Sequence, residues 1–222
     1  MMQSGLQRLW MAIRSYPVFF AGNALFLLVA LVFRLLAEKG ALLLYFSAHR
    51  GEFWTLFFKF GTLLGEAYVY IAASGILAFV AYRMALAVPL LGVGVTLASF
   101  ILKKIFSQPR PPAYFTELGR FDELSLIAGV KVYMGYNSFP SGHTMSAYAL
   151  FTFLLLALER RAGSGIQLLF AGIVITVGLS RVYLMHHFIE DVWLGAVTGM
   201  LMGWLWYDQV APRLPVAGRW KK

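Results

Sequence analysis

The sequence contains no cysteine, and only 13% of its 222 residues are charged. The absence of cysteine excludes disulfide bonds, thiolate catalysis and cysteine-held iron–sulfur clusters. The low charge content excludes an ordinary soluble domain, in which about 25% of residues are charged. Acidic residues are the scarcest, since 10 Asp and Glu stand against 19 Lys and Arg.

Hydrophobic residues make up 60% of the chain, and its mean hydropathy is +0.72. These values predict an integral membrane protein whose solvent is the bilayer over most of its length. A net charge of +9 would suggest a nucleic-acid partner in a soluble protein. Here the cations lie mainly at the ends of apolar runs, which favours anionic lipid headgroups and no nucleic acid. With no internal repeat, the chain is expected to form one membrane domain over 1–222.

Six apolar runs predict transmembrane helices, because a helix needs about 20 apolar residues to cross a bilayer. The expected helices lie at 18–36, 61–82, 84–102, 141–158, 166–185 and 188–207. The predicted fold class is therefore all-α, an integral membrane bundle of six transmembrane helices.

Three other segments are expected at the membrane surface. The segment 1–16 is predicted to form an amphipathic interfacial helix, because apolar residues recur at helical spacing at Leu6, Leu9, Trp10 and Ile13. The run 41–60 is interrupted by charged residues, so it is expected to lie on the surface rather than to cross. The long connection 112–139 is too apolar for disorder, and we expect it to pack beside the active site as a lid or rim.

Four polar clusters are predicted to meet on one face of the membrane, because successive helices alternate in direction. They follow the third expected helix, begin the fourth, end the fifth and begin the sixth, at 103–111, 141–143, 180–181 and 187–191. Ionisable groups at membrane depth are costly and usually mark a functional site.

The cluster at 141–143 begins a helix. Ser141 is a typical capping residue, and Gly142 permits a close approach of the backbone to a ligand. The first amides of a helix suit an anion such as phosphate. His143 would then stand beside that anion, able to exchange a proton near neutral pH.

His187 and Asp191 are four residues apart, so they share one face of a helix. The carboxylate can accept the Nδ1–H of the imidazole and leave Nε2 free as a nucleophile. The same spacing relates His186 to Glu190, so the local pattern leaves both pairs open.

Three cations complete the set of candidate ligands, namely Lys103, Arg110 and Arg181. Arginine binds phosphate oxygens in bidentate fashion, and such a clamp stabilises the charge of a phosphoryl transition state.

Taken together, Lys103-x6-Arg110-Pro111, Pro140-Ser141-Gly142-His143 and Ser180-Arg181-x5-His187-x3-Asp191 resemble the three-part signature of the type 2 phosphatidic acid phosphatase family. This superfamily also includes vanadium haloperoxidases and glucose-6-phosphatase. The three parts cover residues 103–191, and the six-helix layout extends the likeness over most of the chain.

The resemblance implies a metal-independent phosphatase that needs no cofactor. In that family His187 would attack phosphorus and form a phosphohistidine, Asp191 would orient it, and His143 would protonate the leaving oxygen. The family spacing selects His187 over His186. The phosphoryl oxygens would be held by Lys103, Arg110, Ser141, Gly142 and Arg181.

The expected substrate is a phosphate or pyrophosphate of a membrane lipid. Undecaprenyl diphosphate, phosphatidylglycerophosphate, phosphatidic acid and a lipid A phosphate all remain open. Glu66 either contacts the substrate headgroup or pairs with a motif cation, unless it is an ordinary acid at a helix end. The alternatives to an enzyme are a phospholipid or phosphate transporter and an inactive binding protein using the same anion site.

The distribution of Lys and Arg favours cytoplasmic termini only weakly. We therefore expect a multi-pass protein of the inner (plasma) membrane with its active site on the periplasmic, outer face. Gly195, Gly199 and Gly203 form a small-residue stripe for close helix packing, either within the chain or in a homodimer.

Overall fold

A computed structural model of the chain describes residues 4–158 and 162–214. These residues form helices and no strand, which confirms the all-α class. Residues 1–3, which begin the predicted interfacial helix, lie outside the described residues. So do five of the cations that favour cytoplasmic termini, namely Arg160, Arg161, Arg219, Lys221 and Lys222. The elements are α1 (Gly5–Ser15), α2 (Pro17–Leu36), α3 (Ala41–Ala48), α4 (Glu52–Gly61), η1 (Thr62–Gly65), α5 (Ala67–Val80), α6 (Tyr82–Phe106), α7 (Pro111–Glu117), η2 (Phe121–Glu123), α8 (Gly142–Ala157), α9 (Ser164–Tyr183), α10 (Ile189–Leu205), η4 (Trp206–Val210) and η5 (Ala211–Arg213).

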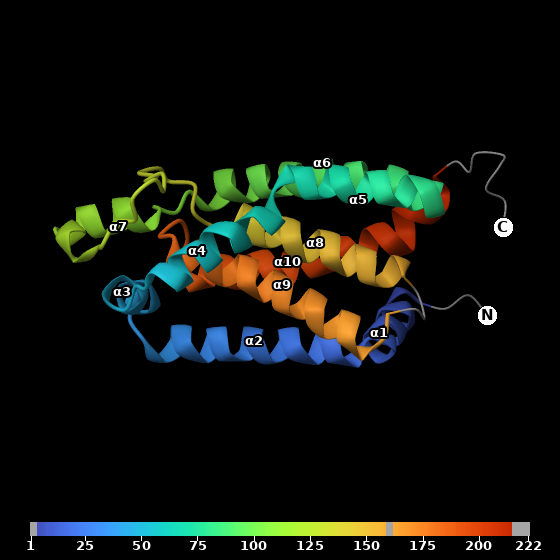
Figure 1. Cartoon of the computed structure of the whole chain (residues 1–222), viewed down its shortest axis with the longest axis horizontal. Helices are drawn as coiled ribbons and strands as arrows, with labels where there is room; N and C mark the ends of the chain where they lie inside the picture. Colours follow the sequence, from blue (N-terminus) through green and yellow to red (C-terminus); the bar gives the residue numbers. More distant parts are fainter. Residues whose placement is uncertain (1–3, 159–161, 215–222) are drawn as a thin grey trace.

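The long helices run side by side in an elongated bundle (Figure 1). Helices α8, α9 and α10 lie in the middle, α2 covers one side, and α5 and α6 cover the other (Figure 1). Helix α8 is buried nearly all round, and Tyr148, Leu150 and Phe153 are fully enclosed. It is the central helix because its sequence is apolar on every face.

The glycine stripe of α10 packs against α8 of the same chain. A Cβ atom on Gly199 would lie 2.5 Å from the Met145 carbonyl oxygen and 2.7 Å from the Tyr148 Cβ. One on Gly195 would lie 2.7 Å from the Ser141 carbonyl oxygen. Only glycine permits this approach, so the stripe sets the distance between the two helices that begin at the candidate site.

Helix α6 continues through Pro89, although a proline interrupts the hydrogen-bond ladder of a helix. Proline has no N–H to donate to the carbonyl four residues earlier, which belongs to Ala85. The hydroxyl of Ser74 in α5 donates to that carbonyl oxygen at 2.7 Å. The neighbouring helix thus satisfies the group that Pro89 leaves free.

The helix boundaries differ most from expectation at 61–82, where one continuous helix was predicted. Helices α4 and α5 are bent by 57° relative to each other, and η1 lies between them. Glu66 has an extended backbone with φ −87° and ψ 162°, so it interrupts the helix between η1 and α5. The bend buries Thr62 and Gly65 against the bundle, while Leu63 and Leu64 between them stay exposed.

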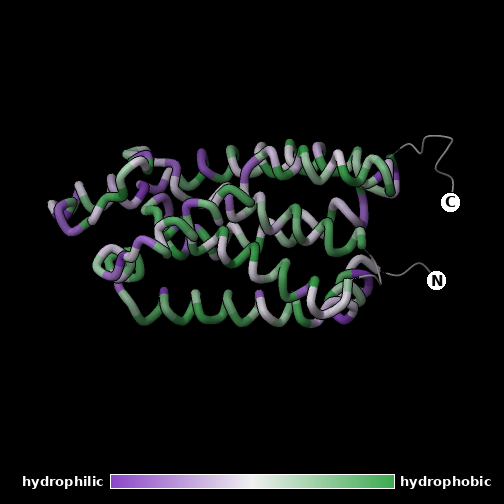
Figure 2. The backbone as a smooth tube through the Cα atoms, in the orientation of Figure 1, coloured by the Kyte–Doolittle hydropathy of each residue, from purple (hydrophilic) through white to green (hydrophobic). Residues whose placement is uncertain are grey.

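Three stretches in the described ranges are long and apolar enough to cross a membrane, namely α2, α9 and Tyr82–Glu117, which contains α6. A fourth crossing is added if α4 and α5 count as one bent span. Helix α8 has 16 residues and α10 has 17. The outer helices are hydrophobic over most of their length (Figure 2). An integral membrane protein is supported, whereas six crossings and an interfacial position of α1 stay predictions.

The connection 112–139 packs on the bundle end where α3 and α7 lie (Figure 1). It contains most of α7 and all of η2, two short elements that the sequence reasoning did not anticipate. Phe115 and Leu124 are buried with Leu43 and Phe188 in one apolar cluster. Lys59 of α4 donates to the Ala128 carbonyl oxygen at 2.8 Å. The connection is therefore anchored to the end of the bundle that holds the polar clusters.

Candidate active site

His187 lies in the short loop between α9 and α10, where it is 1% exposed. Its Nδ1 is 3.1 Å from the Oδ2 atom of Asp191 in the first turn of α10. The same oxygen accepts the backbone N–H of Phe188 at 3.0 Å. This carboxylate holds both the imidazole and the helix start, so Nδ1 carries the proton and Nε2 remains free.

Ser138 is a further contact of this pair that sequence reasoning missed. It is fully buried, its hydroxyl donates a short hydrogen bond to Asp191 Oδ2, and its Oγ lies 3.4 Å from His187 Nδ1. Its position two residues before Pro140 of the second motif was the only sign of it in the sequence. Ser138 fixes the carboxylate against the loop that leads into α8.

Burial lowers the pKa of His187 well below its usual value, and the nearby charges of Arg110, Arg181 and Lys103 lower it further. The imidazole is therefore neutral near pH 7. A neutral imidazole with Nδ1 bonded to a carboxylate has its lone pair on Nε2, as a nucleophile requires.

Arg110 is the residue directly before α7, at the end of the short loop that follows α6. Its Nε donates to Asn137 Oδ1 at 2.7 Å and its Nη1 to the His186 carbonyl oxygen at 3.2 Å. The guanidinium also stacks over the ring of Tyr133, with 4.7 Å to the ring centroid. These contacts fix the cation beside the loop that presents His187.

Arg181 lies in the last turn of α9 and is 4% exposed. Its Nη1 donates to the hydroxyl of Thr62 at 2.5 Å, while its Nε is buried without a hydrogen-bond partner. An unpaired guanidinium N–H in a buried position is costly unless a ligand accepts it. Both Arg181 and Lys103 interact electrostatically with His143 and with His187.

The start of α8 joins these parts. Ser141 is the N-cap residue, its backbone N–H donates to the Asp191 carbonyl oxygen at 3.0 Å, and its hydroxyl accepts from Thr144 Oγ1 at 2.8 Å. A Cβ atom on Gly142 would lie 3.7 Å from Lys103 Nζ. The helix N-terminus and the ammonium group therefore face the same small region, which suits an anion.

His143 contacts a carboxylate that lies outside the three motifs. Its Nε2 is 2.7 Å from Glu66 Oε1, at the bend between α4 and α5. Glu66 thus pairs with a motif histidine, whereas the sequence reasoning had considered a motif cation or the substrate headgroup as its partner.

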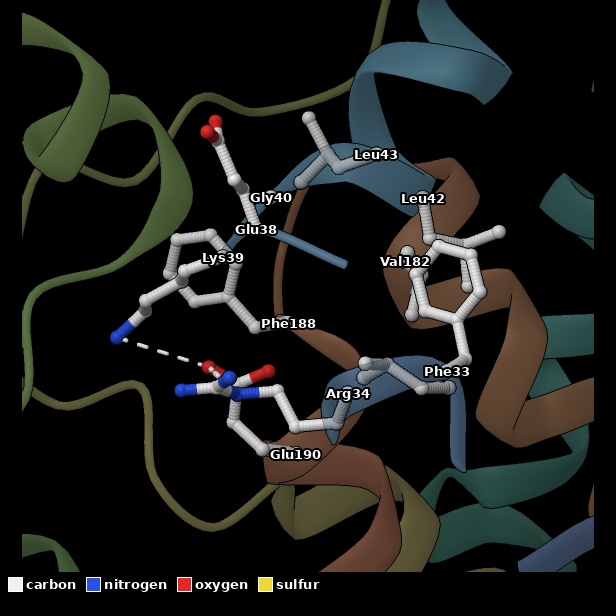
Figure 3. A pocket seen from close by; sticks show the side chains of 11 residues that line it. Phe33, Arg34, Glu38, Lys39, Gly40, Leu42, Leu43, Val182, Phe188 and Glu190 are labelled. Atoms are coloured by element: carbon white, nitrogen blue, oxygen red, sulfur yellow. Dashed lines mark ion pairs between the residues drawn. The ribbon is translucent and has the colours of Figure 1, made fainter. Parts of the chain in front are cut away.

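The alternative pair of His186 and Glu190 is not formed. His186 Nε2 is 3.1 Å from the Lys131 carbonyl oxygen. Figure 3 shows Glu190 facing Arg34 and Lys39, and each of these ion pairs measures 3.7 Å. The ion pair with Arg34 connects α10 to the end of α2. The pocket that Glu190 lines has a volume of only about 10 Å³, which is too small for a substrate.

A much larger open groove of about 760 Å³ runs between α5, α6 and α8. Its walls are mainly apolar and include Ile71, Val93 and Phe100. Gly142 and His143 also line it, so the groove is continuous with the polar cluster.

All eight motif residues named from the sequence lie in this one region, and Glu66 joins them. Within residues 4–158 and 162–214, no group of three or more His, Cys, Asp or Glu side chains is arranged to hold a metal ion. The bundle and site define a helical membrane protein with two histidine–carboxylate pairs beside a cluster of cations.

A sequence model of the PAP2 superfamily matches residues 79–215, and the chain belongs to this superfamily. The match covers the three polar motifs and all of helices α6 to α10. The predicted relationship to the type 2 phosphatidic acid phosphatases is thereby confirmed.

Two solved structures share the fold. The crystal structure of Aquifex aeolicus LpxE aligns with a TM-score of 0.63 at 24% identity, covering 77% of this chain and 94% of that one. The crystal structure of a transmembrane PAP2-type phosphatidylglycerolphosphate phosphatase from Bacillus subtilis aligns with a TM-score of 0.60 at 22% identity, covering 84% and 92%.

Curated relatives match over a shorter stretch. Glucose-6-phosphatase 3 of Rattus norvegicus is 31% identical and that of Homo sapiens 30% identical, each over 86 residues. The match covers 35% of this chain but only 24% of either relative, so the chain spans about a quarter of their length.

Proposed function

We propose that this protein is a membrane lipid phosphatase that hydrolyses a phosphomonoester or pyrophosphate of a lipid through a phosphohistidine. The observation that carries the proposal is a neutral, carboxylate-bound imidazole, His187, surrounded by three cations beside a long apolar groove. The names of the related proteins, which are phosphatases, support the reaction class.

In the first step Nε2 of His187 attacks phosphorus, an N–P bond forms, and the P–O bond to the lipid breaks. The electron pair of that bond goes to the lipid oxygen, which takes a proton from His143. Lys103, Arg110 and Arg181 bind the phosphoryl oxygens and stabilise their charge in the transition state. Ser141 and the Gly142 amide add hydrogen-bond donors at the start of α8.

In the second step a water molecule attacks phosphorus and gives its proton to His143. The N–P bond breaks, inorganic phosphate leaves, and His187 is regenerated with Asp191 still bound at Nδ1. His143 gives a proton in the first step and regains one from water in the second, while the three cations offset the charge of the phosphoryl group. The proposed reaction therefore requires no metal or other cofactor.

The groove supports a lipid as the substrate. Its apolar walls suit hydrocarbon chains, while Gly142 and His143 line the same space and lie beside the cations. Undecaprenyl diphosphate, phosphatidylglycerophosphate, phosphatidic acid and a lipid A phosphate each combine a phosphate with long hydrocarbon chains, and we retain all four as candidates. The substrate would enter from the bilayer.

The test is phosphate release by the purified protein in detergent, using those four lipids and a short water-soluble phosphate ester. We expect release from at least one lipid in excess chelator, inhibition by vanadate, and faster turnover of the lipid than of the short ester. Rapid quenching should leave an acid-labile phosphoryl group on the peptide that contains His187. Binding or transport of a lipid phosphate with no release would favour the transporter or the inactive binding protein.

A further inference from the structure

The bend between α4 and α5 brings residues 62–66 against the start of α8. A Cβ atom on Gly65 would lie 2.9 Å from the His143 carbonyl oxygen and 3.0 Å from Val177 Cγ1, so only glycine permits this approach. Thr62 contacts Arg181, and Glu66 contacts His143. This segment, which belongs to none of the three motifs, therefore touches two of the residues in the proposed phosphatase site.

Glu66 is directed at His143 and not at its own helix. It is the N-cap residue of α5, yet its side chain makes no capping hydrogen bond. Its Oε1 atom instead lies 2.7 Å from His143 Nε2. The carboxylate is 42% exposed and the imidazole 30%, so the pair stands at the open side of the site.

We propose that Glu66 is the positioning residue of His143, in a second histidine–carboxylate pair that complements His187 and Asp191. The proposal rests on the proposed lipid phosphatase function. Nε2–H of His143 donates to Glu66, which holds the ring and leaves Nδ1 to exchange the proton with the lipid oxygen. Asp191 thus orients the imidazole of His187 for attack, and Glu66 supports His143 as proton donor.

The charge of Glu66 has a specific function at this position. Arg181 of α9 and Lys103 of α6 face His143, and both cations oppose a positive charge on its ring. His186 also lies within electrostatic reach. Glu66, at the bend between α4 and α5, faces the His143 ring with a negative charge that opposes these cations. It favours the protonated imidazole, which must give its proton to the leaving oxygen.

The experiment compares E66Q with E66D and with the control variant E52Q. Glu52 is an exposed residue at the start of α4, on the same bent pair but with its side chain outside the site. Each variant is assayed from pH 5 to pH 10 on two substrates, an alkyl phosphomonoester lipid and an aryl phosphate. An aryl oxide is a good leaving group that needs little protonation, whereas an alkoxide needs a proton donor.

For E66Q we expect turnover of the alkyl ester to fall about 100-fold, while turnover of the aryl phosphate falls less than about threefold. The alkaline limb of the alkyl-ester profile should move to lower pH by about one unit, because the anion that stabilises the protonated ring is lost. E66D should restore the wild-type limb in part, and E52Q should match the wild type.

Equal losses on both substrates with an unchanged alkaline limb would overturn the proposal, since a merely structural role acts on both reactions alike. Unchanged turnover in E66Q would also overturn it. If the wild type releases phosphate from neither substrate, the proposed function fails and the role of Glu66 fails with it. An active wild type with an unaltered E66Q profile refutes the role of Glu66 alone.

Discussion

At the residue scale, two adjacent histidines differ completely in their surroundings. His187 faces Asp191, whereas His186 contacts a backbone carbonyl and the ring of Tyr133. Burial lowers the pKa of His186 to about 3, and the charge of Arg181 contributes. His186 is thus a neutral packing residue with no carboxylate at its ring, and only His187 has the partner that a nucleophile needs.

We therefore predict that H187A abolishes phosphate release, with a loss of roughly 10³-fold or more, because the variant lacks the imidazole that forms the bond to phosphorus in the proposed mechanism. H186A should keep most of the activity, since it loses only a ring contact and a hydrogen bond to the loop. Steady-state turnover of the two purified variants is the measurement. Equal losses in both would contradict the assignment of the nucleophile.

Ser138 leads to a second prediction at this scale. S138A removes a donor to the buried Asp191 carboxylate, so turnover should fall about 10-fold as the imidazole loses its fixed orientation. The free energy of unfolding should fall by about 1–3 kcal/mol, because the carboxylate loses a hydrogen bond. The exposed Ser125 provides the control S125A, which should change neither quantity. Wild-type turnover in S138A would show that Ser138 plays no part in orienting the pair.

At the element scale, close packing of α8 and α10 brings the start of α8, with His143, next to the start of α10, with Asp191. Helix α8 begins with Ser141 to His143, and α10 begins two residues after His187. The glycines of α10 bring the two helix starts into direct contact through the hydrogen bond from Ser141 N–H to the Asp191 carbonyl oxygen. Spacing the helices farther apart would separate the two parts of the site.

G199A tests this packing. The added methyl group would lie 2.5 Å from the Met145 carbonyl oxygen, so the helices must move apart, and we expect the free energy of unfolding to fall by about 1–3 kcal/mol. Thermal unfolding in detergent measures the effect, and turnover should fall as well. G75A is the matched control, since no heavy atom lies within 4 Å of a Cβ atom there. Equal melting temperatures for G199A and the wild type would contradict the packing argument.

Also at this scale, the bend at residues 62–66 explains where sequence reasoning fell short. The composition of 61–82 is apolar enough for one straight span, and Gly61 and Gly65 weaken a helix there without specifying a bend. The bend depends on Gly65 meeting His143 and on Glu66 finding a partner in α8. Both contacts are tertiary, so the pattern along the chain could not predict them.

At the scale of the whole molecule, the polar clusters lie at one end of the bundle and α1 lies at the other (Figure 1). Arg8 of α1 pairs with Asp208 of η4 at 2.8 Å, so the two ends of the described chain meet near that opposite end. The two ends would face opposite sides of a membrane. The weak excess of cations on the side of the termini favours a site on the outer face, and we propose this orientation.

The chain contains no cysteine, so one engineered thiol reports on one position. We predict that D122C, in the connection 112–139, is labelled by an impermeant maleimide in intact spheroplasts, whose inner membrane is sealed. S15C, at the end of α1, should be labelled only after permeabilisation. Both native residues are exposed, so burial does not account for a difference. Protection of D122C together with labelling of S15C would reverse the orientation.

The sequence by itself determined the all-α class, the apolar helices and the order of the three motifs. Hydrophobic run length and residue spacing are local properties, so they can be read along the chain. The family spacing already favoured His187 over His186, and the tertiary structure shows the contact of His187 with Asp191. Only the tertiary structure decided that Ser138 binds Asp191 and that Glu66 meets His143. Ser138 and Asp191 are 53 residues apart, and Glu66 and His143 are 77 apart. Such contacts depend on how helices pack and bend, and no periodicity along the chain encodes them.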